Sequence, residues 1–207
     1  MDAWQIFMMT LAGVGLSAAC GFRVFVPPLA MCIAHKAGML NFTGEFAWMG
    51  SDVALVAFSI ATVLEIGAYY IPWLDNALDA IAGPAAVTAG TMTTAAFLVN
   101  EDPWLQWTLA AIAGGGAAGT VQVATTITRG ASSALTGGTG NWIVSTAEAG
   151  GSVAVSLLAV FIPIAAAGLF FVLLAYVIYK NPMKMYRQWR GSRRSASPPK
   201  TPNVLPA

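Results

Sequence analysis

The sequence predicts an all-α protein, a polytopic transmembrane bundle of about five spans with interrupted or re-entrant helices. Two observations carry this prediction. Hydrophobic residues make up 57% of the 207 residues and charged residues only 9%, whereas soluble domains carry roughly 25% charge. Several uncharged runs also reach the ~20 residues that cross about 30 Å of hydrocarbon. A soluble fold would have to bury nearly all of its surface, so we expect a membrane protein.

The first span is predicted over residues 3–34, and Arg23 interrupts it. A charge at this depth costs about 2.5–3.5 kcal/mol, and the neighbouring Gly21, Pro27 and Pro28 weaken the helix beside it. Irregular backbone inside a bilayer persists only where protein or a water-filled cavity covers it. We therefore expect two half-helices that meet at these residues and hold Arg23 in a protein-lined site.

Further spans are predicted over residues 53–71, 81–99, 104–128 and 151–179. The segments between them are expected to be a polar loop, a short amphipathic segment, an acidic turn and a Gly/Ser/Thr-rich loop, over residues 35–50, 72–79, 100–103 and 130–150. The last apolar run is too long for one straight crossing, so we expect it to be tilted, kinked at Pro163 or interrupted. A complete break at Pro163 would give six crossings.

Residues 1–180 are predicted to form the transmembrane domain, and residues 181–207 a basic, Pro/Ser-rich and disordered tail. Lys and Arg concentrate after residue 179. The positive-inside bias then places this tail in the cytoplasm and, with five crossings, the N-terminus outside. Membrane lipids are expected partners, because a basic tail beside a span can contact anionic lipid. A homo-oligomer or a larger membrane complex stays open, and nucleic-acid binding is not expected.

A spacing of 101 residues relates several small residues in the two halves of the chain. The matched pairs are Gly13 with Gly114, Gly15 with Gly116, and Gly50-Ser51 with Gly151-Ser152. One hypothesis is an inverted repeat with halves 1–100 and 101–180, which would place a site near the bilayer midplane. The other is chance agreement in a Gly/Ala-rich chain. Independently of a repeat, the run that includes Gly115 favours close helix contacts.

Polar stripes on three spans each end near an ionisable side chain. Arg23 ends the stripe of the first span, Glu65 lies on the second, and Gln122 and Arg129 lie three or four residues from their polar neighbours on the fourth. Such stripes are costly against lipid, so they should face one another. Two interpretations remain: a polar cavity that binds an ion or small polar solute, and a structural Arg–Glu pair through which no solute passes.

Asp75 and Asp79 are four residues apart, a spacing that also occurs in Mg²⁺-dependent intramembrane enzymes. One isolated pair is a poor metal signal, so we expect a helix start capped by Asp75. Two cysteines and a single histidine make no metal constellation. The sequence therefore predicts no metal, no cofactor and no enzymatic activity.

Four segments, residues 15–29, 46–51, 72–84 and 137–141, resemble a bacterial membrane family catalogued as domain of unknown function 4126. The resemblance covers about residues 5–180 and implies a bacterial inner-membrane protein, with no established activity. The family motifs include several of the polar positions singled out above, together with Asn141 as a motif residue: Arg23, Asp75, Asn76, Asp79 and Asn141.

The first functional hypothesis is a small transporter or channel with a site formed by Arg23, Glu65, Gln122, Arg129, Asp75, Asn76 and Asp79. The second is a structural or assembly subunit, because abundant Gly and Ala favour close helix packing. The third is lipid binding at the cytoplasmic face through the basic tail.

Overall fold

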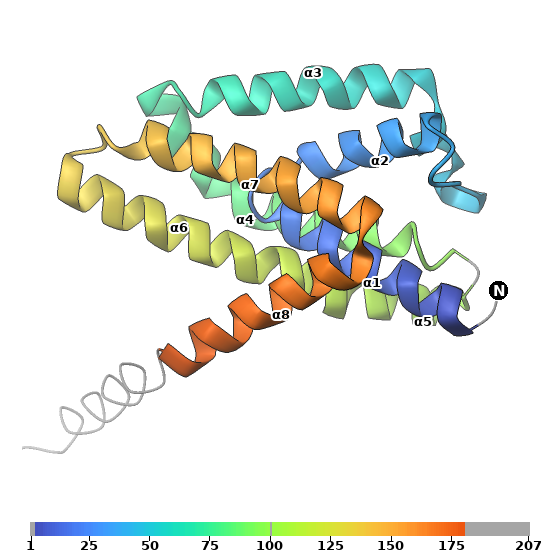
Figure 1. Cartoon of the computed structure of the whole chain (residues 1–207). Coiled ribbons are helices and arrows are strands. Elements are labelled where there is room, and N and C mark those ends of the chain that lie inside the picture. Colours follow the sequence, from blue (N-terminus) through green and yellow to red (C-terminus); the bar gives the residue numbers. More distant parts are fainter. Residues whose placement is uncertain (1–2, 100, 181–207) are drawn as a thin grey trace, which may run out of the picture. The chain divides into compact units, whose positions relative to one another are not determined.

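The computed structural model describes residues 3–99 and 101–180, which form helices and turns without a strand (Figure 1). The prediction of an all-α fold is therefore confirmed. The chain divides into two compact units, residues 1–170 and 171–207. The predicted tail, residues 181–207, lies outside the described residues. The arrangement below is that of the first unit.

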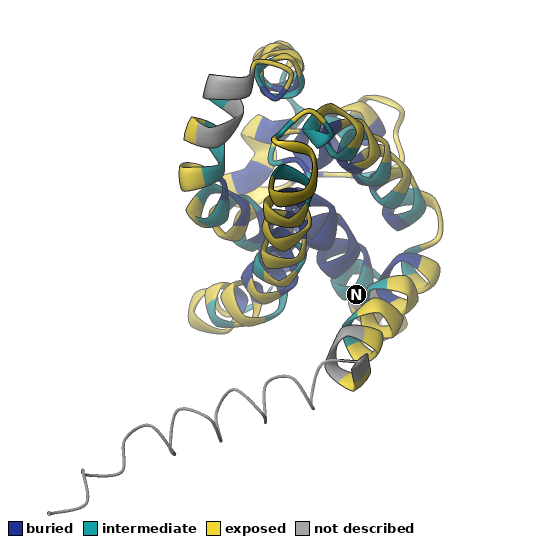
Figure 2. Ribbon diagram, turned by 90° about the vertical axis from the view of Figure 1, so that its left-hand side faces the viewer, coloured by how far each residue is buried: buried dark blue, intermediate teal, exposed yellow. Residues whose placement is uncertain are grey.

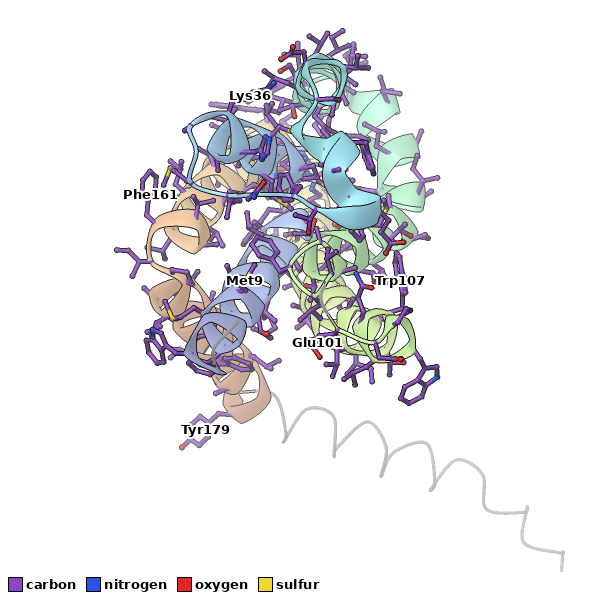
Figure 3. All side chains as sticks on the ribbon, turned by 90° about the vertical axis from the view of Figure 1, so that its right-hand side faces the viewer. Met9, Lys36, Glu101, Trp107, Phe161 and Tyr179 are labelled. Carbon is purple, nitrogen blue, oxygen red and sulfur yellow. The ribbon has the colours of Figure 1, made fainter. Side chains whose placement is uncertain are left out.

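The first apolar run folds as two helices, α1 (Ala3–Cys20) and α2 (Val26–Lys36), separated by a break at the predicted position. Pro27 and Pro28 lie in the first turn of α2, where a missing N–H leaves no bond unmade. The run does not continue in one direction, because α2 turns back along α1 (Figure 1). Met9 and Lys36 consequently lie at the same end of the unit (Figure 3). In place of the single crossing predicted over residues 3–34, the segment forms a helical hairpin of α1 and α2, interrupted where the sequence predicted a break.

The helices that follow the hairpin differ from the predicted segments at two places. A 3₁₀ helix, η1 (Gly44–Gly50), leads into α3 (Asp52–Ala68), which Ser51 caps by accepting the N–H of Ala54. The segment predicted over 72–79 and the span predicted over 81–99 form one helix, α4 (Pro72–Ala95). This helix continues through Pro84, and it begins at Pro72, so Asp75 is not its cap.

The next pass consists of α5 (Pro103–Leu109), a π-helical turn η2 (Ala110–Gly115) and α6 (Gly116–Thr136). The sequence predicted that this pass would end at Arg129, but α6 continues to Thr136. The helix stops only at Gly137, whose φ of 62° is left-handed and favours glycine.

The last pass of the first unit is α7 (Asn141–Phe161). It starts within the loop predicted over residues 130–150, of which only the short connection after Thr136 is non-helical. The glycines of this segment do not prevent a helix, because each costs only about 1 kcal/mol of helix stability and tertiary contacts can offset this cost. The predicted break near Pro163 is present, because α8 (Pro163–Lys180) begins after Ile162.

The buried residues gather on the inner faces of the helices, around α1 (Figure 2). Several of the glycines that were predicted to allow close helix packing do lie at helix crossings. A Cβ on Gly15 would lie 2.8 Å from the Cβ of Ala166, and one on Gly114 would lie 2.5 Å from the carbonyl oxygen of Gly90. Gly13, Gly21 and Gly115 also closely approach other helices, whereas Gly116 has open space.

The helix pattern does not repeat at the 101-residue spacing. Gly50 and Ser51 precede α3, whereas Gly151 and Ser152 lie in the middle of α7. The break between α1 and α2 likewise corresponds to continuous helix in α6. At this spacing the halves 1–100 and 101–180 therefore differ in secondary structure.

Among the described residues, one helix is long and apolar enough by itself to cross a membrane, Asn141–Phe161. A second span is added if the bent pair Gly44–Gly50 and Asp52–Ala68 counts as one. This is weak evidence for a membrane, and the predicted count of five spans is not established by it.

Candidate functional site

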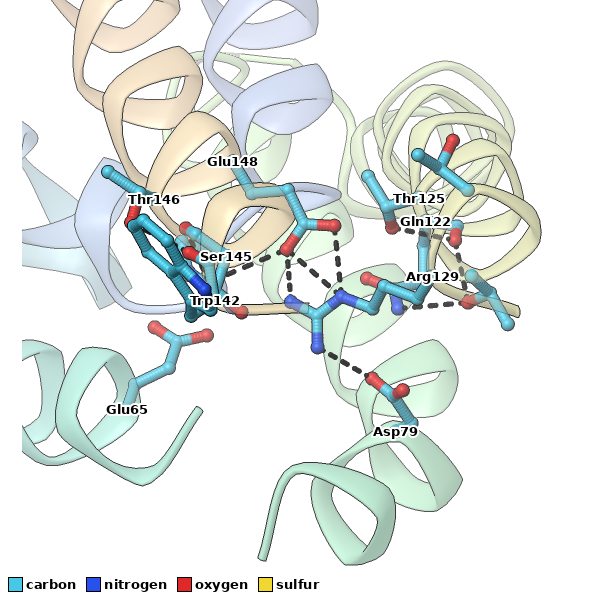
Figure 4. A network of polar contacts seen from close by, with 12 residues as sticks. Glu65, Asp79, Gln122, Thr125, Arg129, Trp142, Ser145, Thr146 and Glu148 are labelled. Atoms are coloured by element: carbon cyan, nitrogen blue, oxygen red, sulfur yellow. Dashed lines mark hydrogen bonds and ion pairs between the residues drawn. The ribbon is translucent and has the colours of Figure 1, made fainter. Parts of the chain in front are cut away.

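A buried ion-pair cluster lies between the inner faces of α4, α6 and α7 (Figure 4). Its centre is Glu148 on α7, which is 5% exposed. The Nε of Arg129 donates to both carboxylate oxygens of Glu148, at 3.0 and 3.1 Å, and Nη2 of Arg129 also donates to Oε2. The Nη1 of Arg129 is 3.1 Å from Oδ1 of Asp79 on α4. One guanidinium therefore joins three helices.

Arg23, in the break between α1 and α2, reaches the same carboxylate. Its Nη2 donates to the carbonyl oxygen of Ser145 at 2.9 Å and lies 3.4 Å from Oε2 of Glu148. The residue is 1% exposed, yet its Nε and Nη1 have no hydrogen-bond partner among the described residues. The hydroxyl of Ser145 also has none. Each unmade bond of a buried polar group costs about 1–3 kcal/mol, and more for charged groups.

The ring of Tyr69 contacts both cations. The Cζ of Arg23 is 3.9 Å from the ring centroid, and the Cζ of Arg129 is 4.0 Å from it. Cation–π contacts of desolvated cations are worth about 2 kcal/mol. Tyr69, which directly follows α3, thus helps to hold two like charges close together.

Glu65 on α3, a residue of the predicted site, is held by backbone groups at the break between α1 and α2. Its carboxylate accepts the backbone N–H groups of Val24 at 2.7 Å and of Phe25 at 3.0 Å. These groups lie just before α2, at its N-cap residue Phe25 and the residue before it, and a negative charge is favoured near a helix N-terminus by its unsatisfied donors and its dipole. Glu65 therefore joins α3 to the α1–α2 hairpin through these two hydrogen bonds.

The remaining predicted residues lie in the same part of the unit. Gln122 is buried on α6 and donates to Oγ1 of Thr126 at 3.4 Å. Asn141 exchanges hydrogen bonds with Ser133 and joins the ends of α6 and α7. Asp75 and Asn76 lie on α4, but their side chains are outside the described part of the structure.

Sequence reasoning missed Glu148 and Ser145. A signal for the α7 residues existed: the buried polar side chains of this helix are spaced three, four and four apart, which is one helical face, namely Ser145, Glu148, Ser152 and Ser156. The assignment of residues 130–150 to a loop concealed this stripe.

A pocket of about 350 Å³ adjoins the cluster between α6 and α7. Phe22, Thr125, Thr128 and Glu148 contribute to its lining. Among the described residues, no three His, Cys, Asp or Glu side chains are grouped so that they could hold a metal ion.

The family model described as domain of unknown function (DUF4126) matches residues 10–181, which is most of the chain. The chain belongs to this family. Comparisons with curated proteins and with solved structures find no similar protein. Membership in DUF4126 fits the resemblance of the four segments and assigns no activity.

Proposed function

We propose that this DUF4126 protein is a polytopic protein of the bacterial inner membrane that binds a small polar solute or ion at the α1–α2 break and lets it cross. The observation that carries the proposal is the fully buried Arg23 guanidinium, which keeps unused N–H donors beside a polar cluster. The membrane placement, the solute and its passage are each part of the proposal.

The distribution of polarity supports the membrane placement. Charged side chains of the cluster are buried inside, while large apolar residues such as Val53, Val63, Ile127 and Leu135 are at least 66% exposed. Exposed apolar surface of this extent is rare in soluble monomers, and buried charge is typical of membrane bundles with a function. Lys36 marks its end of the unit as the cytoplasmic one by the positive-inside bias.

The re-entrant hairpin supports a solute site. Many transporters place the N-terminus of a half-helix near the bilayer midplane, where its N–H groups face the substrate. Here α2 is such a short helix of 11 residues, and its N-terminus lies beside Arg23. The pocket that borders Glu148 gives a route by which solvent can approach the cluster.

The assembly hypothesis is less well supported. Its motivation was the abundance of small residues, but Gly15, Gly90 and Gly114 contact helices of this same chain. Close-packing surfaces are thus used within the bundle. The lipid hypothesis rests on the basic tail, which lies outside the described residues.

The test is solute-driven swelling of liposomes that contain the full-length protein, with the swelling rate measured by light scattering. The panel is sodium chloride, potassium chloride, sodium formate, glycerol and urea. We expect faster swelling than in protein-free liposomes for at least one solute, and loss of this rate in Arg23→Gln. Lys36→Gln, which alters an exposed pair at the end of α2, is the control and should keep it. Equal rates with and without protein for the whole panel would contradict the proposal.

A further inference from the structure

Unused hydrogen-bonding capacity at the α1–α2 break defines what can bind there. A guanidinium has five N–H donors and no acceptor, and only Nη2 of Arg23 has described partners. The nearby hydroxyl of Ser145 is also unpartnered. Donors that belong to a cation and lie in a buried site select an oxygen ligand with negative charge.

Glu65 already places one such oxygen ligand at the break. Its carboxylate occupies the N–H groups of Val24 and Phe25, which directly follow Arg23 in the chain. Helix N-termini of this kind bind oxyanions in many proteins. The Glu65 carboxylate therefore occupies the N–H groups that the carboxylate of a bound ligand would use, and the two carboxylates would compete for these donors.

The charge balance sets the condition for binding. Around Glu65, the described ionisable groups are two guanidiniums, two other carboxylates, a phenol and a thiol: Arg23, Arg129, Glu148, Asp79, Tyr69 and Cys20. With Glu65 ionised, three carboxylates face two guanidiniums. A further anion would add to this excess unless one carboxylate takes up a proton. Glu148 and Asp79 are paired with Arg129, which leaves Glu65 as the acceptor of that proton.

We propose that the ligand of this site is a small oxyanion of the carboxylate type, and that it binds together with one proton. The oxyanion accepts the free N–H groups of Arg23, and the proton from solution binds the Glu65 carboxylate. Neutral Glu65 releases the N–H groups of Val24 and Phe25, which then donate to the oxyanion. The total charge of the cluster is unchanged, so the pair can enter and leave a buried site together. This inference rests on the proposed solute site and specifies its substrate.

Binding of formate to the purified full-length protein in detergent micelles tests the coupling. ¹³C-formate line broadening gives the dissociation constant as a function of pH, at constant ionic strength set with chloride. For wild type we expect the dissociation constant to rise by up to tenfold per pH unit once Glu65 is ionised in the free protein. Formate binding that is independent of pH in wild type would overturn the coupling without any variant.

Two substitutions sharpen the test. Glu65→Gln mimics the protonated side chain, so it should bind formate more tightly than wild type at neutral pH and without pH dependence. Arg23→Lys keeps the positive charge but removes most of the donors, so it should weaken formate binding at least tenfold. Circular dichroism and gel filtration check that both variants fold. Weaker binding by Glu65→Gln than by wild type would overturn the proposal.

The swelling panel separates this inference from the proposed function. If sodium, potassium, glycerol or urea permeates in an Arg23-dependent way while formate neither binds nor permeates, the solute site stands and the oxyanion assignment fails. If no solute of the panel permeates and formate does not bind, both fail. Formate signals that stay unperturbed at every pH also overturn the assignment.

Discussion

The strongest prediction for stability concerns Glu148, because two cations share its carboxylate. Glu148→Gln keeps the shape of the side chain and removes one negative charge next to Arg23 and Arg129. Asp79 then remains paired with Arg129, whereas Arg23 loses the carboxylate that its Nη2 contacts. Removing one partner of a buried ion pair costs about 3–5 kcal/mol, since the other charge stays buried without compensation. We expect the free energy of unfolding to fall by this amount.

The assay is denaturant unfolding in mixed micelles, followed by circular dichroism. The matched control is Asp52→Asn, which removes the carboxylate of the exposed pair with Lys36 and should lower the free energy of unfolding far less than Glu148→Gln does. The double variant Glu148→Gln/Arg129→Gln should lose less than the sum of the single variants, because charge and counter-charge leave together. A loss below about 1 kcal/mol for Glu148→Gln, as for a surface pair, would refute the buried cluster.

Three further predictions use the same unfolding measurements. Gly114→Ala should lose about 1–3 kcal/mol from overpacking against a backbone carbonyl of α4, whereas Gly116→Ala, which has open space, should gain roughly 0.4–1 kcal/mol; equal effects would argue against this helix crossing. Tyr69→Leu should lose about 2 kcal/mol with its two cation–π contacts, while Tyr69→Phe keeps the ring and should lose little. The Lys36 ammonium lowers the pKa of the Asp52 carboxyl below its ordinary 3.8. That pair therefore adds stability above this pH and loses it as the pH falls, so Asp52→Asn should show a smaller decline of the melting temperature between about pH 5 and pH 2 than wild type.

The break in the first apolar run was predictable because its causes are local. A charge, a glycine and two prolines within a few residues weaken a helix in any context. Whether the chain then continues or turns back depends on contacts with other helices, such as the bonds from Val24 and Phe25 to Glu65. Those contacts join residues about 40 positions apart, so the local sequence does not contain the answer.

The candidate site was predicted in part. Arg23 and Arg129 were chosen because charges in apolar helices must be sheltered, and both are buried in one cluster with Asp79. The sequence did not indicate which carboxylate would pair with which guanidinium, because polar spacing along single helices does not fix the contacts between helices; Glu65 accepts backbone N–H groups instead. Glu148 was overlooked because glycine, serine and threonine around it resemble a loop, although packing stabilises them as helix α7.

The most direct test of the account is the sidedness of single cysteines in sealed membranes. In a background with Cys20 and Cys32 replaced by alanine, Trp4→Cys, Ala37→Cys and Thr139→Cys would each be exposed to a membrane-impermeant maleimide. Because the α1–α2 hairpin turns back, we predict labelling of positions 4 and 37 from the same side and of position 139 from the opposite side. Labelling of positions 4 and 37 from opposite sides would show a straight crossing and contradict the re-entrant site around Arg23.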